Sequence, residues 1–249
     1  MRTIKEQLVA EFVGTLALVF IGAGSVIIAF ANGGGYAGLI GVALAHGFVL
    51  ATFISGLGPV SGGHFNPAVT IAVWVGGKIE ATRAGGYMLA QLVGAVTGAG
   101  LLRWVLPEQA WRSATLGATL VSHQFGITTA KAILLEAILT FLLVITVFAV
   151  AVDDRGVFKS IAGLPIGLVL VFDILVGGQL TGASMNPARS FGPALVAGKW
   201  TDFWVYLVGP ISGGIIAASL YTFVFLRARE VAAPMSDTPI GGGPGEEVA

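Results

Sequence analysis

The sequence predicts an all-α membrane protein with six transmembrane helices and two half-length helices, arranged as two inverted repeats. Hydrophobic residues make up 55% of the 249-residue chain and charged residues only 10%, a composition typical of proteins that cross the bilayer many times. Six apolar stretches have about the 20 residues that one crossing requires. Two further stretches are too short to cross, and each begins with Asn-Pro-Ala, at Asn66 and Asn186.

Charge and cysteine content exclude several classes of function. The chain carries 13 basic and 13 acidic residues, so its zero net charge provides no basic surface for nucleic acid. Cysteine is absent, which excludes disulfides, thiolate metal sites and cysteine nucleophiles. His46, His64 and His123 fall on separate elements without the spacing of metal ligands. We therefore expect no metal, no cofactor and no enzymatic activity.

The first half of the chain is expected to hold three spans and one half helix. A short, mildly basic arm covers residues 1–7. Spans are predicted over residues 8–31, 36–57 and 84–106, and the half helix over 66–75. Gly58-Pro59 is expected to end the second span. Gly94 and Gly98 are four residues apart, a spacing that lets membrane helices approach closely.

The second half repeats this order after a polar connection, residues 107–129. Spans are predicted over residues 130–152, 160–180 and 202–226, and the half helix over 186–197. The membrane domain would thus cover residues 8–227, with repeats over 8–106 and 130–227. The tail, residues 228–249, is rich in Pro, Gly, Ser and acids, and we expect it to be disordered.

Matching residues show that the two halves are related. Glu11 and Glu136 lie near the start of each half, and Tyr87 with Gly94 matches Tyr206 with Gly213. Because each half has three spans, an odd number, the second half begins on the opposite side of the membrane. Broken helices at matching places in inverted halves indicate a permeation site near the midplane.

Lysine and arginine in the flanks of the spans predict the orientation. They are more numerous on the side that holds the N-terminus, and such residues favour the cytoplasmic side. We therefore expect an integral membrane protein with several spans and both termini in the cytoplasm. The cell membrane is the expected location.

Each half helix is predicted to point its amino end at a pore. Asn is a preferred N-cap, and Pro67 and Pro187 occupy the first helical position, where the missing N–H costs nothing. Irregular backbone at membrane depth must be buried or line a wet cavity. Carbonyls of the segments before each motif should therefore line the pore, namely those of Gly62, Gly63, His64, Phe65, Gly182, Ser184 and Met185.

Two facing amino ends would pass water and reject cations. Each carries roughly half a positive charge from its aligned peptide dipoles, so a cation between them is repelled. The amides of Asn66 and Asn186 can donate to one passing oxygen. A water held in this way points its hydrogens away from both amides, and the chain of hydrogen bonds that protons would follow is interrupted.

These motifs resemble those of the aquaporin or major intrinsic protein family. The resemblance covers about residues 8–227 and includes both Asn-Pro-Ala motifs, Ser61-Gly62-Gly63-His64 and the sequence Asn186-Pro187-Ala188-Arg189-Ser190. It implies a water channel with six tilted helices, two half helices and a homotetramer with one pore in each subunit. It also implies that Glu11 and Glu136 are scaffold residues that hold the half-helix loops by hydrogen bonds.

The resemblance also implies a selectivity filter. A charged side chain at membrane depth normally faces a polar cavity or a partner, so Arg189 is either a filter residue or a structural arginine paired to a carbonyl or an acid. In the family, the matching arginine forms a constriction with three positions that correspond here to His46, Ile174 and Ala183. For His46 the alternative is a core histidine bonded to a neighbouring carbonyl.

The filter set is most similar to that of the plant tonoplast intrinsic subgroup. Its width and apolar character should admit water and also ammonia, urea or hydrogen peroxide. Ser190 and Ala194 match water channels and not glycerol facilitators, whereas Leu207 matches the glycerol type. A glycerol-type facilitator is therefore kept as an alternative.

A proton-coupled secondary transporter is the remaining alternative. It would use Glu11, Glu136 and Asp173 as proton carriers. Asp173 is adjacent to the proposed filter residue Ile174, so it is either a packed polar anchor or a modifier of the pore mouth.

Overall fold

The computed structural model describes residues 2–155 and 159–226, and the predicted tail over 228–249 lies outside them. Within these two ranges, the six long helices are α1 (Ile4–Ala31), α2 (Gly35–Ser61), α4 (Ala81–Val105), α6 (Thr129–Val147), α7 (Gly163–Gly177) and α9 (Val205–Leu220). The half helices are α3 (Pro67–Val75) and α8 (Pro187–Ala197). Shorter elements are α5 (Glu108–Ser113), η1 (Thr115–Gly117), η2 (His123–Phe125), η3 (Phe148–Val152), η4 (Lys159–Ile161) and η5 (Tyr221–Leu226).

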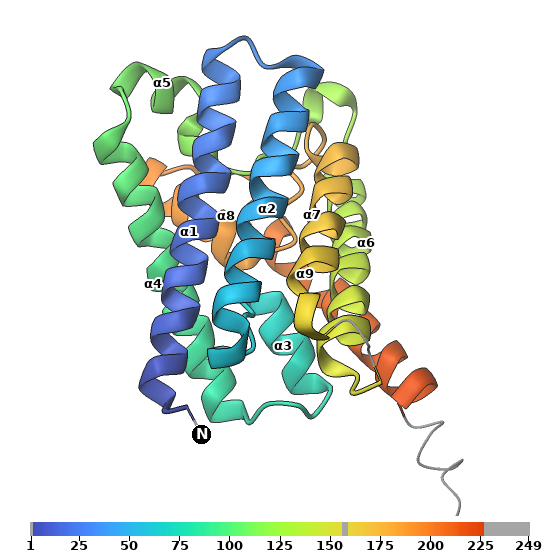
Figure 1. Cartoon of the computed structure of the whole chain (residues 1–249). Helices are drawn as coiled ribbons and strands as arrows, with labels where there is room; N and C mark the ends of the chain where they lie inside the picture. Colours follow the sequence, from blue (N-terminus) through green and yellow to red (C-terminus); the bar gives the residue numbers. More distant parts are fainter. Residues whose placement is uncertain (1, 156–158, 227–249) are drawn as a thin grey trace, which may run out of the picture.

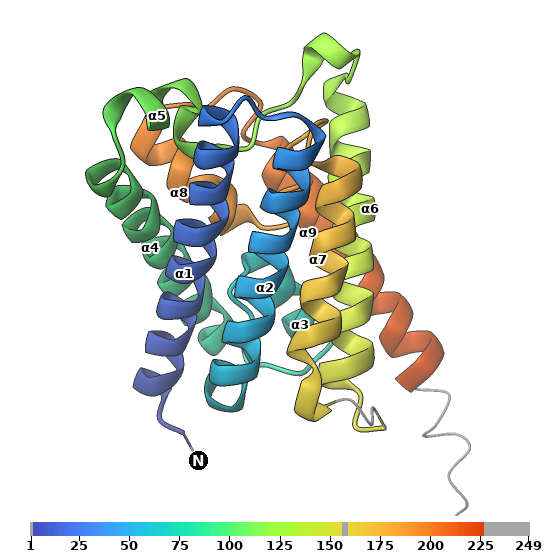
Figure 2. The same ribbon diagram turned by 45° about the horizontal axis from the view of Figure 1, so that its top comes forward.

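The long helices stand side by side and surround the two half helices (Figure 1). Helix α3 lies in the half of the molecule that holds the N-terminus, and α8 lies in the opposite half, so their amino ends meet in the interior (Figure 2). This is the predicted all-helical fold with two half helices. Asn66 and Asn186 are the N-caps, and each side chain accepts a backbone N–H of the first turn.

Five helical segments are long and apolar enough to cross a membrane in the part of the chain that the structure describes. The sixth predicted span, α7, has only 15 residues. At 1.5 Å per residue it is about 22 Å long, shorter than the hydrocarbon core. The turn η4 precedes α7 and the turn residues 178–181 follow it, so these segments extend the crossing.

Glycines permit the closest helix pairs, and these pairs follow the repeat. Helix α1 packs on α4, and α6 packs on α9. A Cβ atom at Gly94 would lie 2.4 Å from the carbonyl oxygen of Phe12, and one at Gly213 would lie 2.0 Å from that of Ala137. Only glycine fits at either position, which confirms the close packing predicted for Gly94.

Several helix boundaries differ from the prediction, among them the starts of α4, α7 and α9, and two of the differences have a clear local cause. Helix α2 continues through Gly58-Pro59 and ends at Ser61, because Pro59 lies in the last turn and removes only one intrahelical bond. The carbonyl that loses this bond belongs to Ser55, which lines a cavity that water can enter. Helix α1 begins earlier than expected, at Ile4, because Thr3 and Glu6 form a capping box.

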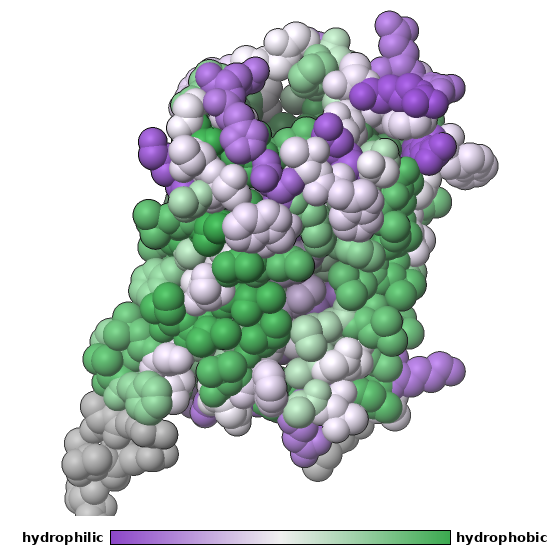
Figure 3. Space-filling model, turned by 180° about the vertical axis from the view of Figure 1, so that it is seen from behind, coloured by the Kyte–Doolittle hydropathy of each residue, from purple (hydrophilic) through white to green (hydrophobic). Residues whose placement is uncertain are grey.

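The surface has the banded pattern of a protein that spans a membrane. In the view from behind, hydrophobic side chains form a broad band, and hydrophilic side chains gather at the two ends (Figure 3). Large apolar residues that face outward include Leu89, Val176 and Ile216, each more than half exposed. The band therefore matches a lipid environment, in which the long helices bury their backbone polar groups internally.

Candidate functional site

The first half-helix loop is organised around the buried carboxylate of Glu11, which is 0% exposed. It accepts hydrogen bonds from the Ser61 hydroxyl at 2.6 Å, the His64 N–H at 3.0 Å and the Phe65 N–H at 2.7 Å. The side-chain amide of Gln91 donates a fourth bond at 2.8 Å. The first three donors belong to the segment just before Asn66, so their bonds to Glu11 fix this loop, which is the arrangement expected of a scaffold.

Glu136 holds the second loop in the same way. It is also 0% exposed, and it accepts from the Thr181 hydroxyl at 2.7 Å, the Ser184 N–H at 2.9 Å and the Met185 N–H at 2.8 Å. These donors correspond in position to those around Glu11. Loss of the negative charge would leave the buried N–H groups of Ser184 and Met185 poorly paired, and this arrangement supports the scaffold role expected of Glu136.

The residues directly before the two asparagines have left-handed backbone conformations. The φ angle is +48° at Phe65 and +52° at Met185, values that non-glycine residues rarely adopt. Ala183 has a φ of +43°. Such strain persists only where surrounding contacts dictate the conformation. Here the bonds to the two buried glutamates supply these contacts.

The two asparagines hold each other's loops. The Asn66 amide donates to the Met185 carbonyl at 2.8 Å, and the Asn186 amide donates to the Phe65 carbonyl at 2.9 Å. Each Oδ1 atom accepts from the first turn of its own half helix, at Ala68 and at Ala188. This reciprocal contact fixes the two amino ends of α3 and α8 against one another.

One N–H of each asparagine remains for a molecule in the passage. A side-chain amide has two donor hydrogens, and in Asn66 and Asn186 one of them is used in the reciprocal contact. The Asn186 oxygen accepts two backbone N–H groups and the Asn66 oxygen accepts one, so both oxygens are turned toward the first turns of the half helices. The pair therefore presents one free N–H from each amide, and these two donors favour a water that turns its oxygen toward them.

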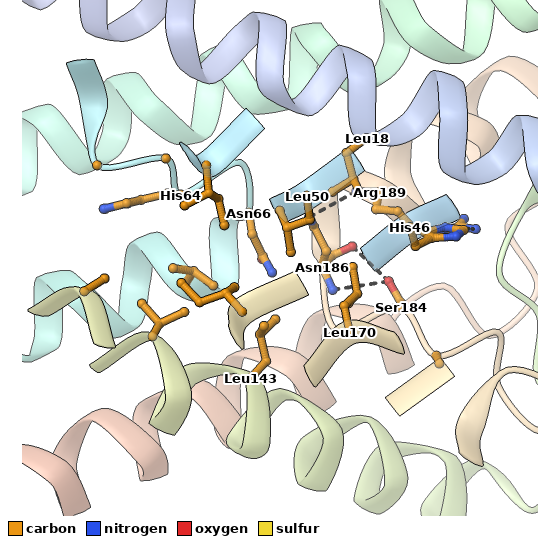
Figure 4. Close-up of a pocket in the computed structure, with 18 residues that line it drawn as sticks. Leu18, His46, Leu50, His64, Asn66, Leu143, Leu170, Ser184, Asn186 and Arg189 are labelled. Atoms are coloured by element: carbon orange, nitrogen blue, oxygen red, sulfur yellow. Dashed lines mark hydrogen bonds between the residues drawn. The ribbon is translucent and has the colours of Figure 1, made fainter. Parts of the chain in front are cut away.

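A narrow cavity, here called the pore cavity, passes this pair (Figure 4). Its volume of about 30 Å³ has room for roughly two or three water molecules. Most of its wall is aliphatic, from Leu18, Leu50, Ile54, Val69, Leu143, Val147, Ile166 and Leu170. The polar groups on it are few and come chiefly from the half-helix loops, from His46 and from Arg189.

The guanidinium of Arg189 lies at one end of the pore cavity and is 3% exposed. It donates to the Gly117 carbonyl at 2.9 Å, and its other terminal nitrogen lies 3.4 Å from Nε2 of His46. Its Nε has no partner among the described residues, and no acid there lies within ion-pair distance. The charge is therefore held by neutral groups and acts on whatever enters the cavity.

The tautomer of His46 follows from its neighbours. Nδ1 lies 2.9 Å from the Val42 carbonyl, which only accepts, so Nδ1 carries the hydrogen. Arginine only donates, so Nε2 must offer its lone pair to Arg189. His46 is thus bonded to a neighbouring carbonyl, as its structural reading requires, and it also lines the pore cavity beside Arg189, as its filter reading requires.

The other two predicted filter residues lie on either side of Arg189. Ala183 lines the pore cavity. Ile174 lines a wider cavity of about 230 Å³, here called the vestibule, on the side opposite the N-terminus. Arg189 borders both cavities, so the structure brings His46, Ala183 and Arg189 together and places Ile174 at the outer approach.

The predicted carbonyl ladder is only partly in the wall of the passage. Gly62, Gly63, His64 and Ser184 line the pore cavity, and Gly182 lines the vestibule. Phe65 and Met185 are 0% exposed, and their carbonyls accept the asparagine amides described above. These two carbonyls stabilise the meeting of the half helices.

Asp173 lies away from both cavities. Its side chain is 1% exposed, and neither carboxyl oxygen has a hydrogen-bond partner among the described residues. It is not among the residues that line the pore cavity or the vestibule. The structure thus gives Asp173 no direct place in the passage.

Several residues of the site carry no sequence signal of their own. The Gly117 carbonyl that binds Arg189 belongs to the connection between the halves, 72 positions away. Gln91 and Thr70 support the first loop from behind, with 2.9 Å between the Gln91 amide and the Thr70 hydroxyl. The Asn-Pro-Ala motif and the repeated context of Glu11 pointed to this loop, but neither pattern identified Gln91, Thr70 or Gly117.

Comparison with known proteins gives consistent results. The family model described as Major intrinsic protein matches residues 1–221. Aquaporin TIP1-1 of Zea mays is 44% identical over 234 residues, covering 92% of this chain and 90% of the relative. Probable aquaporin TIP3-2 of Arabidopsis thaliana is 43% identical over 229 residues, covering 87% and 82%.

A solved structure has the same fold. The aquaglyceroporin from Plasmodium falciparum superposes with a TM-score of 0.78 at 25% sequence identity. The alignment covers 92% of this chain and 100% of that chain.

Proposed function

The chain belongs to the major intrinsic protein family and is a passive transmembrane water channel, and we propose that two places along its passage decide what crosses. The first is the pair Asn66 and Asn186. The second is the constriction at Arg189. The observation that carries this proposal is the reciprocal bonding of the asparagines, which leaves one N–H of each for a water molecule.

Water passes this pair with its orientation fixed. Its oxygen accepts the two free amide hydrogens, and its own hydrogens point along the passage in opposite directions. A proton hopping along the file would need the central water to reorient, and the paired donors oppose this. The aliphatic wall offers few competing partners, so water molecules exchange bonds mainly with one another and with the loops.

Charge supplies a second barrier. The amino ends of α3 and α8 both face the centre, and their dipoles oppose a cation there. Arg189 adds a full positive charge without an acid in ion-pair distance among the described residues. These features favour a channel over the proton-coupled alternative, as do the fully engaged carboxylates of Glu11 and Glu136.

We extend the proposal to small neutral solutes. Ile174 and Ala183 add aliphatic surface and no donor to the approach and the filter, so ammonia, urea or hydrogen peroxide would meet only His46 and Arg189 as polar filter side chains. For the glycerol-type alternative, Leu207 is the supporting residue. It is 37% exposed and is absent from the lining of both cavities, which speaks against a direct role in glycerol passage.

Stopped-flow light scattering on proteoliposomes tests this assignment. The wild-type chain should speed osmotic shrinkage without dissipating a pH gradient. Replacing Arg189 by Ala or His46 by Ala should raise urea and glycerol permeability relative to water. Arg103→Ala is the matched control, because Arg103 bonds the Val196 carbonyl in an exposed position. If both filter variants keep wild-type selectivity, the filter assignment is wrong.

Assembly and location are further parts of the proposal. The pore cavity lies within one chain, and we propose a homotetramer in which every subunit has its own passage. We also propose that both termini face the cytoplasm, which Lys78 and Arg83 support, because they line a cavity on the N-terminal side. The multi-pass chain would reside in the cell membrane. Cross-linking in native membranes and imaging of a tagged chain test these points.

A further inference from the structure

The two half helices carry matching hydroxyls four residues after the motif asparagine, Thr70 and Ser190. In the first half, the Thr70 hydroxyl donates to the Asn66 carbonyl at 3.0 Å and accepts from the Gln91 amide at 2.9 Å. Gln91 is 0% exposed and also bonds the scaffold carboxylate. Gln91 of α4 thus links Thr70 of the first half helix to the carboxylate of Glu11.

The second half has no counterpart of Gln91. Gln91 follows Tyr87 by four positions, and the residue that follows the matching Tyr206 by four positions is Pro210. Proline has no donor. The hydroxyl of Ser190 instead lies 2.6 Å from that of Thr119, a residue of the connection between the halves. Thr119 therefore occupies the place that Gln91 fills in the first half.

The hydroxyls around Ser190 form a chain with a defined direction. Ser184 donates to the Asn186 carbonyl at 2.9 Å. Its single hydrogen is then used, so in the 2.6 Å contact between Ser184 and Ser190 the donor is Ser190. The single hydrogen of Ser190 is used in that contact, so in the 2.6 Å contact between Thr119 and Ser190 the donor is Thr119. We call this chain, Thr119 to Ser190 to Ser184 to the Asn186 carbonyl, the hydroxyl relay.

The relay is buried behind the loop that forms the filter. Thr119 is 6% exposed, Ser184 is 3% exposed and Ser190 is 1% exposed. Thr119 also packs on the loop backbone, since a Cβ atom at Gly182 would lie 3.0 Å from Cα, Cβ and Cγ2 of Thr119. Residues 182–186 are therefore held by Glu136 through their N–H groups and by Thr119 from the vestibule side.

We propose that Thr119 is a positioning residue for solute selection, acting through Ser190 and Ser184. The relay fixes the loop that carries Ala183 next to Arg189. It also directs the hydrogen of Ser184, which lines the pore cavity, toward the Asn186 carbonyl, so that Ser184 offers no donor to a passing solute. This inference rests on the proposed filter and adds a residue that does not belong to it.

Permeability of three variants tests the proposal in proteoliposomes. Thr119→Val keeps the side-chain shape and removes the hydroxyl, and Thr119→Ser keeps the hydroxyl. We expect Thr119→Val to raise the ratio of glycerol to water permeability by about threefold to tenfold, the factor that corresponds to one neutral hydrogen bond. Thr119→Ser should restore the wild-type ratio. Thr97→Val is the matched control, because the Thr97 hydroxyl bonds only its own helix in an exposed position.

A double-mutant cycle separates the relay from general packing. Ser190→Ala removes the middle of the relay, so Thr119→Val should add no further change in that background. Additive effects of the two substitutions would overturn the proposal, as would an unchanged ratio in Thr119→Val. If Thr119→Val does not fold, Ser190→Ala alone decides, and a wild-type ratio in that variant rejects the relay.

The same measurements keep this inference distinct from the proposed filter. Wild-type water permeability and the Arg189→Ala variant report on the filter itself. A selective filter with no response to either relay substitution refutes the role of Thr119 and leaves the filter assignment in place. A wild-type chain that does not discriminate glycerol from water would instead refute the filter assignment itself.

Discussion

The imidazole of His46 lies so close to α1 that a Cβ atom at Gly22 would stand 2.5 Å from its Nε2 atom. Gly22 thereby makes room for the ring in the position where Nε2 faces Arg189. The location of the proposed filter residue His46 on α2 thus depends on the absence of a side chain at Gly22 on α1.

Gly22→Ala should therefore displace the His46 ring and change permeability. We expect water permeability per folded channel to fall about threefold or more, because a backbone-anchored ring 2.5 Å from the new Cβ must move and the cavity is narrow. Stopped-flow shrinkage measures this. Gly100→Ala is the control, since nothing lies within 4 Å of a Cβ there. Equal permeability in the two variants would contradict the prediction.

Glu136→Gln should destabilise the folded chain. The Thr181 hydroxyl and the N–H groups of Ser184 and Met185 lose a charged acceptor, and the new NH₂ group faces donors. We expect a loss of about 3 kcal/mol in the free energy of unfolding, typical of buried donors left unpaired. Thermal unfolding followed by size-exclusion chromatography measures it.

The exposed Glu108→Gln, which breaks only the ion pair with Arg112, should change stability little. A Glu136→Gln variant as stable as Glu108→Gln would show that Glu136 is no scaffold. The proton-coupled alternative makes a different prediction, namely solute uptake driven by a pH gradient that this variant abolishes.

Ser190→Asp should increase glycerol passage. A carboxylate only accepts, so Thr119 and Ser184 would both donate to it, and the Asn186 carbonyl would lose the hydrogen of Ser184. The relay would then no longer direct the Ser184 hydroxyl, which lines the pore cavity, toward the Asn186 carbonyl. We expect the glycerol-to-water ratio to rise about threefold to tenfold. Ser113→Asp, at an exposed position, is the control. An unchanged ratio in folded Ser190→Asp would argue against this account.

His123 should be protonated at the pH where most histidines are neutral. Its Nε2 lies 2.7 Å from the Asp202 carboxylate and its Nδ1 lies 2.9 Å from the Ile127 carbonyl, and two acceptors require two N–H groups. The hydrogen bond to Asp202, followed by that to Ile127, raises the pKa of His123 above its ordinary 6.5.

The contact should therefore stabilise the folded chain at low pH. A raised folded-state pKa gives a contribution that is fully present below pH 6.5 and is lost as pH rises through the higher folded-state pKa. The melting temperature of the wild type should exceed that of Asp202→Asn at pH 6, and the difference should shrink above the folded pKa. Asn tolerates the φ of +52° at this position, so the backbone stays undisturbed. A His123 pKa at or below 6.5 by NMR titration would refute the prediction.

The sequence predicted those parts of the molecule that depend on local chemistry. Asn-Pro starts both half helices because N-cap and first-turn preferences act within a few residues. The repeated sequence around Glu11 and Glu136 indicated equivalent roles, because each half has a loop of the same design before its half helix. Gly94 was identified by spacing, since close helix contact requires a small residue.

Other features depend on contacts between distant segments and have no local pattern. The Gly117 carbonyl reaches Arg189 only because the connection between the halves folds back over the vestibule. Thr119 meets Ser190 for the same reason. Pro59 misled the prediction, because a proline in the last turn of a helix disrupts little.

The reciprocal bonds of the two asparagines have a consequence for how the chain is made. The amide of Asn66 has no acceptor until Met185 has been synthesised, 119 positions later, and Phe65 likewise awaits Asn186. The amino-terminal half, when it is inserted first, therefore lacks the partners that hold its half-helix loop at the centre. The pore cavity is likewise lined by residues of both halves, so the amino-terminal half alone supplies only part of its wall.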